Sequence, residues 1–262
     1  MIPQAAITHW RNVAPWPQDA QVEQDLILCR ALVEIFSDLV LAKALFLRGG
    51  TALHKLFVTS PHRYSEDIDL VQISAGPIGS VLDALRARLD PILGKPRREN
   101  SAHNVTLRYR MESEIAPIVP LRLKIEINTR EHFAVFEAAD HPFSVRSPWF
   151  EGRANVRSYA LDELLATKLR ALYQRRKGRD LFDLWLGLGL PGVDAGRIVE
   201  AFRKYMKAEG NKVSQSEFQK NLDAKIASRQ FGEDLSPLLA PAIRYDVGEA
   251  ARIVTEKLLS RL

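Results

Sequence analysis

The periodicity of the hydrophobic residues changes once along this chain, near residue 160. Before that point three segments alternate apolar and polar side chains, SEDIDLVQI at 65–73, NVTLRYRM at 104–111 and LRLKIEIN at 121–128. A period of two residues predicts strands. Beyond residue 160 the period becomes helical, and we expect helices over 160–175, 179–188, 194–208, 214–228 and 246–261. The chain is therefore predicted to be α+β, with a strand-rich N-terminal domain over 1–150 and a helical C-terminal domain over 151–262.

The first half also contains helical patterns. Apolar residues recur at helical spacing over 19–37, where Cys29 lies on the predicted buried stripe and Asp19 is the expected N-cap. A second amphipathic helix is predicted over 78–93. We expect residues 1–18 to form an irregular arm, the sheet to end near Val145, and SPWFEGRANVRS at 147–158 to be a loop at the domain boundary.

The composition excludes several classes of protein. In 262 residues, 46% hydrophobic and 26% charged residues are values of a globular protein, and they exclude a disordered tail, a collagen-like repeat and a coiled coil. A single cysteine allows neither an intrachain disulfide nor a four-cysteine zinc site. The N-terminus does not resemble a signal peptide, and no apolar run is long enough to span a membrane. We therefore expect a soluble cytoplasmic protein with no membrane partner, and the net charge of +5 is compatible with a polyanionic partner.

Two aspartates share one predicted strand. In a strand, residues i and i+2 project from the same face, so Asp67 and Asp69 lie roughly 6–7 Å apart. Carboxylates so placed repel each other unless a cation lies between them, and their oxygens suit Mg²⁺. Glu126, on the polar face of LRLKIEIN, becomes a third ligand if that strand is adjacent, and three carboxylates can hold two metals for phosphoryl transfer. The structural alternative is the solvated face of an exposed strand.

Two glycines connect a short apolar strand, LFLR at 45–48, to a helix expected to begin at Thr51. Gly49 and Gly50 allow the backbone to approach a ligand closely, and the helix N-terminus would favour a phosphate group. Thr51 is expected to cap that helix or to donate its hydroxyl to a phosphate. A turn that merely requires glycine is the alternative. The chain contains no GxxxxGK[ST] motif, which excludes an ordinary P-loop NTPase.

Charged residues elsewhere add candidates for the same chemistry. Arg63 and Ser65 precede the acidic pair, and we expect Arg63 to contact phosphates and Ser65 to bind the nucleotide or hold the loop. Lys168 lies beside the apolar stripe of its helix, where it could neutralise triphosphate charge. Gly178 is predicted to start a new helix that Asp180 could cap, with Asp183 one turn later on the same face. The alternative for these three residues is a solvated basic helix with ion pairs.

Four segments together resemble a known family. LRGGTALHKLF, RYSEDIDLV, LKIEIN and LLATKLRALYQRRKGRDLFDLW resemble the nucleotidyltransferase AbiEii/AbiGii toxin family, within the DNA polymerase β-like nucleotidyltransferase superfamily. The fold that this resemblance implies is a mixed sheet with flanking helices, followed by the helical domain. The resemblance implies that Gly49 and Gly50 hold a nucleoside triphosphate and that Asp67 and Asp69 bind Mg²⁺, with Mn²⁺ as an alternative metal. It adds Lys168 and either Asp180 or Asp183 to the active site, whereas Glu126 rests on its strand position alone.

The resemblance also implies a function. Family members are toxins whose gene partner is an antitoxin, and related members add nucleotides from an NTP to the 3′ acceptor end of tRNA, which blocks translation. The expected reaction is metal-assisted nucleotidyl transfer, in which Asp183 could serve as a base. Nucleotidylation of a protein or small molecule and a non-catalytic nucleic-acid-binding module stay open as alternatives. A sugar-transfer enzyme would leave the diglycine turn and the RDLFDL segment unexplained.

Overall fold

The computed structural model describes residues 2–262, and they form two compact units. The first unit contains the chain up to Phe133 together with Ala138–Tyr159, and the second contains Ala134–Glu137 together with Ala160–Leu262. We expected the division after residue 150. It lies after Tyr159 instead, because residues 151–158 form a strand that pairs within the sheet of the first unit.

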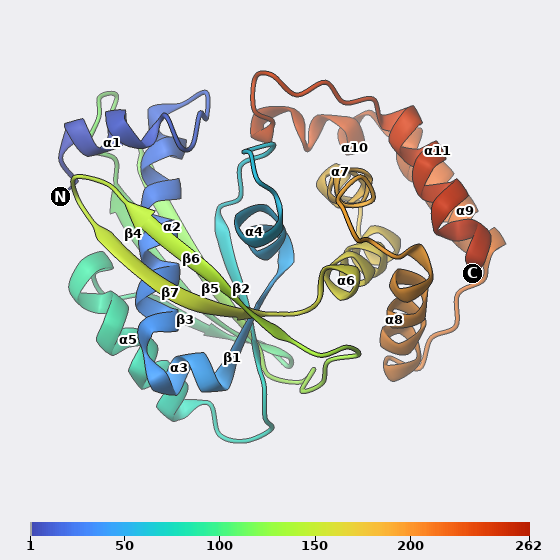
Figure 1. The fold of residues 1–262 in the computed structure, drawn as a ribbon, viewed down its shortest axis with the longest axis horizontal. Helices are drawn as coiled ribbons and strands as arrows, with labels where there is room; N and C mark the ends of the chain where they lie inside the picture. Colours follow the sequence, from blue (N-terminus) through green and yellow to red (C-terminus); the bar gives the residue numbers. More distant parts are fainter. Residues whose placement is uncertain (1) are drawn as a thin grey trace. The chain divides into compact units, whose positions relative to one another are not determined.

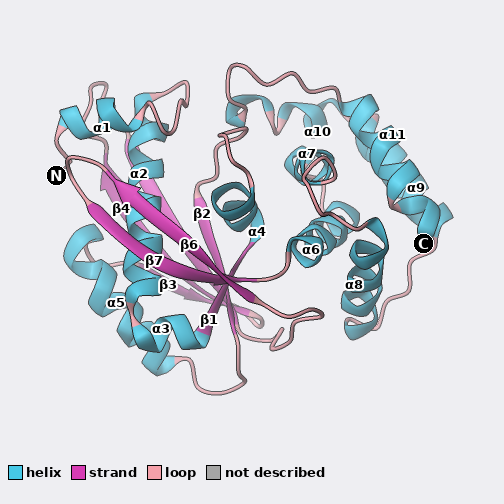
Figure 2. Cartoon of the chain, viewed as in Figure 1, coloured by secondary structure: helices cyan, strands magenta, loops and turns pink. Residues whose placement is uncertain are grey.

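A mixed sheet organises the first unit (Figure 2). Among the described residues its strand order is β3-β4-β5-β2-β1-β7-β6, with β2 parallel to β5, β1 parallel to β7, and the other neighbours antiparallel. The strands are β1 Leu45–Arg48, β2 Asp67–Gln72, β3 Arg97–Asn100, β4 Asn104–Glu112, β5 Pro120–Asn128, β6 Ala139–Arg146 and β7 Glu151–Ser158. The predicted α+β class with a mixed sheet is confirmed.

Helices cover one face of this sheet (Figure 1). Helix α2, Asp19–Ser37, packs on β7, β5 and β2, and α5, Gly79–Leu93, packs on β4. Ile68 and Leu70 of β2 and Ile125 of β5 point toward these helices and are fully buried. Because side chains alternate along a strand, the residues between them face the opposite side of the sheet. That opposite side carries the acidic pair.

Three expectations for the first unit are wrong. Helix α1, Gln4–Trp10, lies within the segment predicted as irregular, and its Ile7 and Trp10 are buried. The sheet does not end near Val145 but continues through the β6–β7 hairpin. Strand β7 has no clear apolar pattern because its inward residues are mostly small, and at Gly152 a Cβ atom would come within 2.9 Å of Val33 on α2. Asp19 is the first residue of α2 rather than its N-cap, which is Gln18.

The segment after β1 also departs from expectation. Helix α4, Gly49–Ala52, begins at the first glycine rather than at Thr51 and continues as a π-helical turn over Leu53–Phe57. Gly49 has a φ angle of +78°, a conformation that L side chains rarely adopt. The glycine is therefore required where the chain leaves β1. Helix α3, Leu39–Ala44, precedes that strand and is capped by Asp38.

The second unit is helical. It contains α6 Leu161–Gln174, α7 Gly178–Gly187, α8 Ala195–Ala208, α9 Gln215–Ile226, α10 Arg229–Glu233 and α11 Val247–Lys257, with 3₁₀ turns at Ser236–Leu238 and Leu259–Arg261. All five predicted helices are present, and only α10 and the 3₁₀ turn before α11 were not foreseen. Glu163 of α6 is fully buried and accepts hydrogen bonds from the backbone N–H groups of Val135 and Phe136 and from the Tyr205 hydroxyl. These bonds explain why residues 134–137 belong to this unit.

Within residues 2–262, no helix is both long enough and apolar enough to cross a membrane.

Candidate active site

The acidic pair lies on the face of the sheet opposite α2 and α5. Asp67 and Asp69 are alternate residues of β2, so they project to the same side. In the parallel register with β5, Asp67 is opposite Lys124 and Asp69 is opposite Glu126. The strand that carries Glu126 is therefore adjacent to β2, which is the condition that the sequence left open. One polar patch collects three carboxylates and one ammonium group.

The diglycine turn lies against this patch. Strand β1 runs antiparallel to β2 with Arg48 opposite Asp69, so the chain reaches Gly49 directly beside that carboxylate. A Cβ atom on Gly49 would lie only 2.4 Å from Asp69 Oδ2. Any side chain at this position would displace the aspartate. The structure thus brings the turn and the second aspartate into contact.

Arg63 and Ser65 adjoin the second glycine. A Cβ atom on Gly50 would lie 2.4 Å from Arg63 Nη2 and 3.3 Å from Ser65 Oγ. Thr51 is buried, and its hydroxyl lies 2.8 Å from Ser65 Oγ and donates a hydrogen bond to the carbonyl oxygen of Asp67. Of the two roles predicted for Thr51, helix cap or phosphate donor, the first is wrong because α4 begins at Gly49. Thr51 ties the turn to the start of β2, and this connection fixes the distance between the glycines and the acidic pair.

Lys124 dominates the electrostatics of the patch. Its Nζ lies 3.0 Å from Asp67 Oδ2 and 3.6 Å from Glu126 Oε2. Burial raises the pKa of Asp67, and the nearby ammonium group of Lys124 offsets only part of that rise. Burial alone would lower the pKa of Lys124, but the charge and hydrogen bond of Asp67 and the charges of Asp69 and Glu126 together outweigh it, and the pKa is raised. Lys124 was not predicted as a site residue, although the alternation of LRLKIEIN places it on the polar face.

The donor set fits a divalent cation held by two carboxylates. Asp67 and Asp69 offer oxygen ligands on one face, and Mg²⁺ commonly uses one or two carboxylates together with water and substrate phosphates. Among the described residues no three His, Cys, Asp or Glu side chains are grouped closely enough to hold a metal. Glu126 instead accepts a hydrogen bond of 3.2 Å from the Asn104 amide and faces Lys124. The pair, rather than the predicted triad, is the arrangement that the structure forms.

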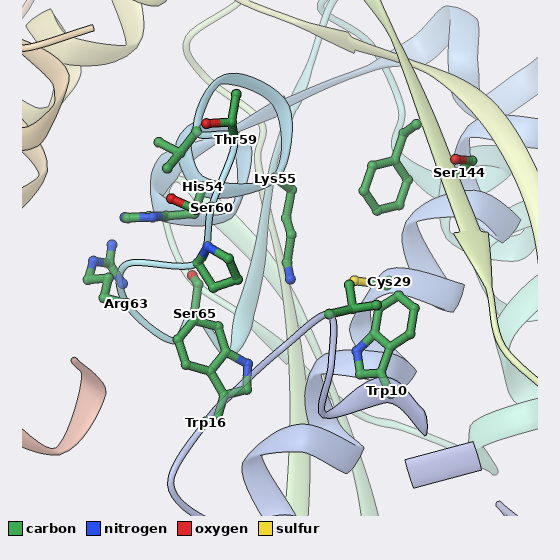
Figure 3. A pocket seen from close by; sticks show the side chains of 14 residues that line it. Trp10, Trp16, Cys29, His54, Lys55, Thr59, Ser60, Arg63, Ser65 and Ser144 are labelled. Atoms are coloured by element: carbon green, nitrogen blue, oxygen red, sulfur yellow. The ribbon is translucent and has the colours of Figure 1, made fainter. Parts of the chain in front are cut away.

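A pocket of about 180 Å³ adjoins the diglycine turn (Figure 3). Its wall combines the indole rings of Trp10 and Trp16 with Lys55, and it shares Arg63 and Ser65 with the turn. Both indole N–H groups and Lys55 Nζ donate to the fully buried carboxylate of Asp25, with the lysine at 2.6 Å. Asp25 could not be singled out from the sequence, because it is one of four acids within the helical pattern of 19–37.

The second unit holds the predicted cluster of Lys168, Asp180 and Asp183. Lys168 Nζ lies 2.8 Å from Asp183 Oδ2 and 3.3 Å from Asp180 Oδ1, and both carboxylates are fully buried. Arg175 adds two hydrogen bonds to Asp180, at 2.7 and 2.8 Å. Burial opposes ionisation of Asp180, but Lys168 and Arg175 outweigh it and lower its pKa. Asp180 is the third residue of α7 and pairs with these cations instead of capping the helix.

A comparison with protein families gives one match. The model described as the nucleotidyl transferase AbiEii toxin of type IV toxin–antitoxin systems matches residues 30–252. This range includes the diglycine turn, the acidic pair and the Lys168 cluster. The sequence has no significant match among curated proteins.

Solved structures share the fold at low sequence identity. MenT4, the nucleotidyltransferase toxin Rv2826c from Mycobacterium tuberculosis H37Rv, aligns with a TM-score of 0.69 and 16% identity over 98% of this chain and 90% of its own. JHP933 from Helicobacter pylori aligns with a TM-score of 0.58 and 19% identity over 93% of this chain and 95% of its own. At these identities the likeness establishes a common fold.

Proposed function

The chain belongs to the nucleotidyl transferase AbiEii toxin family, and on this premise we propose that it transfers a nucleoside monophosphate from an NTP to the 3′ end of tRNA with the help of Mg²⁺. Membership confirms the resemblance read from the sequence and makes the chain a nucleotidyltransferase toxin of a type IV toxin–antitoxin system. A cognate antitoxin is the partner that such a system implies. Growth inhibition would follow from tRNA that can no longer be aminoacylated.

The contact between Asp69 and Gly49 carries this proposal. A nucleotidyl transfer needs a carboxylate pair and a close approach of triphosphate to backbone in the same place, and the 2.4 Å separation from a Gly49 Cβ atom to Asp69 Oδ2 supports that coincidence. Arg63 lies against Gly50 and is buried, so its guanidinium is held beside the turn. A solvated strand face would require none of these contacts.

Each residue of the patch has a role in the proposed reaction. Gly49 and Gly50 admit the phosphates to the backbone, Arg63 neutralises their charge, and Ser65 with Thr51 holds the turn against β2. Asp67 and Asp69 would hold Mg²⁺, with Mn²⁺ as a substitute. When bound, such an ion supplies Lewis-acid stabilisation of phosphate charge and lowers the pKa of an attacking hydroxyl.

The proposal extends to the second unit. We propose that Lys168, Asp180 and Asp183 also contribute to catalysis, with Lys168 as a point cation toward phosphate and a carboxylate as base. In the structure the ammonium group is already held by both carboxylates. In this proposal Asp180 and Asp183 determine the position from which Lys168 acts on the phosphate.

Removing Lys124 is expected to move the acid side of the pH–rate profile. Its charge lowers the pKa of Asp67 against the effect of burial, so in Lys124→Met that pKa rises further. If Asp67 must be ionised to act, activity falls as the pH drops through its pKa, and the variant loses activity at a higher pH than the native protein. The measurement is the initial rate of NMP incorporation against pH at saturating NTP.

A control separates this effect from general damage to the sheet. Lys43→Met removes an exposed lysine from α3, outside the patch, and should leave the profile unchanged. An acid limb in Lys124→Met that coincides with the native one would mean that Asp67 does not control the reaction.

The acceptor is tested directly. The protein is incubated with each NTP in labelled form, Mg²⁺, and either a bulk tRNA pool or total cellular protein. We expect label in the tRNA fraction only, added nucleotides at sequenced 3′ ends, and no incorporation after chelation of the metal. Label in the protein fraction instead would identify a protein nucleotidyltransferase. NTP binding without any transfer would indicate a binding module.

A further inference from the structure

A row of basic side chains extends from the acidic pair across the same face of the sheet. The strand order places β5, β4 and β3 successively beside β2. Lys124 of β5 is opposite Asp67, and Arg108 of β4 is opposite Lys124. Arg97 of β3 is in turn opposite Arg108. Because neighbouring strands are spaced by about 4.8 Å, these two arginines lie roughly 10 and 14 Å from Asp67 across the sheet.

A second basic pair lies beside this row. Arg110 of β4 and Arg122 of β5 are exposed and directly opposite each other. Like charges in that position destabilise a sheet. Neither side chain forms an ion pair with any residue from 2 to 262, and the nearby charge of Glu99 acts on Arg110 without direct contact. The fold alone gives no reason for this pair, whereas an external anion would.

The five basic residues form a positive surface, which we call the basic face. It consists of Arg97, Arg108, Arg110, Arg122 and Lys124. Glu99 is the acid that Arg108 and Arg97 share, at 2.9 and 3.5 Å, yet their side chains are still 43% and 70% exposed. The hydrogen bond from Arg108 lowers the pKa of Glu99, and the charges of Arg97 and Arg110 lower it further. Lys124 is itself paired with Asp67 and Glu126, whereas the four arginines have Glu99 and Glu112 beside them on the same side of β3 and β4, so the arginines exceed these acids in number.

We propose that the basic face binds the phosphate backbone of the acceptor RNA and leads its 3′ end to Asp67 and Asp69. The proposal rests on the proposed function, because it takes the acidic pair as the place of reaction. Lysine and arginine contacts to phosphate supply sequence-independent affinity, and a strand that ends at β2 would place its preceding phosphates over β5, β4 and β3. The row of charges matches that path.

An acidic protein partner would also be attracted to positive charge, but the surface favours RNA. Protein interfaces have an apolar centre surrounded by a polar rim. Among residues 2–262, no exposed large hydrophobic side chain lies on β3, β4 or β5. The basic face is therefore polar throughout, as expected of a surface for a phosphate backbone.

The test compares two double charge reversals with the same change in net charge. The first is Arg110→Glu with Arg122→Glu, on the basic face. The second is Lys43→Glu with Arg98→Glu, where Arg98 neighbours Arg97 on β3 but is opposite the fully buried Leu107, on the face toward the helices. Binding of a fluorescein-labelled single-stranded RNA and of bulk tRNA is measured by anisotropy over a range of salt concentrations, with chelator and without NTP.

We expect the basic-face variant to bind both RNAs at least about ten-fold more weakly. The slope of log affinity against log salt should fall by about 1.4, since each lost contact to a single strand removes roughly 0.7. The control variant should stay within about two-fold of the native protein. An equal loss in both variants would reduce the effect to net charge and overturn the proposal. Unchanged RNA binding by the basic-face variant would also overturn the proposal. If that variant binds RNA normally but no longer binds the antitoxin, the basic face is a protein-binding surface instead.

The RNA-binding measurement does not depend on the proposed transfer reaction. Because binding is measured without NTP or metal, it does not require nucleotidyl transfer to occur. Loss of RNA binding in the basic-face variant, in a protein that labels no RNA with any NTP, would support the surface and refute the proposed function. If both variants still transfer nucleotides to tRNA with the native KM, the proposed function is supported and the RNA-binding role of the basic face is refuted.

Discussion

Asp69→Asn is expected to abolish nucleotide transfer, by at least about 1,000-fold, while the protein stays folded. The substitution keeps the shape that fits against Gly49, where a Cβ atom would lie 2.4 Å from Oδ2, but removes a ligand charge. Loss of metal-assisted stabilisation of several kcal/mol corresponds to that factor. The measurement is the initial rate of labelled NMP incorporation into tRNA, together with thermal unfolding. In cells, expression of the variant should no longer inhibit growth.

Glu126→Gln is the matched control for this prediction. Glu126 lies opposite Asp69 on the neighbouring strand, but its carboxylate accepts a hydrogen bond from Asn104 and faces Lys124. A residue that acts by orienting its neighbours typically costs 10- to 100-fold when it is changed. We expect a loss of about that size. Equal losses in the two variants would make Glu126 a direct ligand, and transfer by Asp69→Asn within about ten-fold of native would remove the acidic pair from the mechanism.

Sequence alone predicted the elements in which one strong pattern determines the structure. Strands β2, β4 and β5 alternate clearly because one face is packed on helices, and the five helices of the second unit have apolar stripes with recognisable ends. Strand β7 was missed since Gly152, Ala154 and Ser158 fill inward positions, and their small side chains carry little hydrophobic signal. Strand β3 was missed because all of its residues are polar and it lies at the edge of the sheet.

Part of the candidate site could likewise be predicted from the sequence, and part could not. That Asp67 and Asp69 share a face follows from the period of a strand and needs no tertiary information. Their contact with Gly49, and the alignment of Lys124 and Glu126 beside them, depend on how β1 and β5 pair with β2. Register between strands distant in sequence is not written in any local pattern. For this reason Lys124 was missed.

Lys168→Met is expected to lower the free energy of unfolding of the second unit by about 3–5 kcal/mol. Removing one partner of a buried ion pair is strongly destabilising, and here Lys168 lies 2.8 Å from the fully buried Asp183. Asp180 keeps both hydrogen bonds from Arg175. The measurement is urea unfolding followed by circular dichroism.

The lowered pKa of Asp180 also predicts how the stability of the second unit depends on pH. Burial raises the pKa of Asp180, but Lys168 and Arg175 lower it more, so the net pKa is below the ordinary value of 3.8. Its contribution to stability is present above that value and is lost as the pH falls through the lower pKa of the folded state. Without Lys168 the pKa of the folded state rises. Acid unfolding of Lys168→Met should therefore begin at a higher pH than that of the native protein.

A double variant separates structure from catalysis in this cluster. Lys168→Met combined with Asp183→Leu replaces both charges by apolar side chains, and such replacements of buried pairs are often neutral for stability. We expect the double variant to regain most of the lost free energy yet to stay inactive in nucleotide transfer, because the proposed catalytic groups are gone. Recovery of transfer together with stability would show that the pair serves only to hold α6 against α7. If the double variant does not regain stability, the attraction between the buried charges stabilises the folded state by more than the free-energy cost of removing them from water.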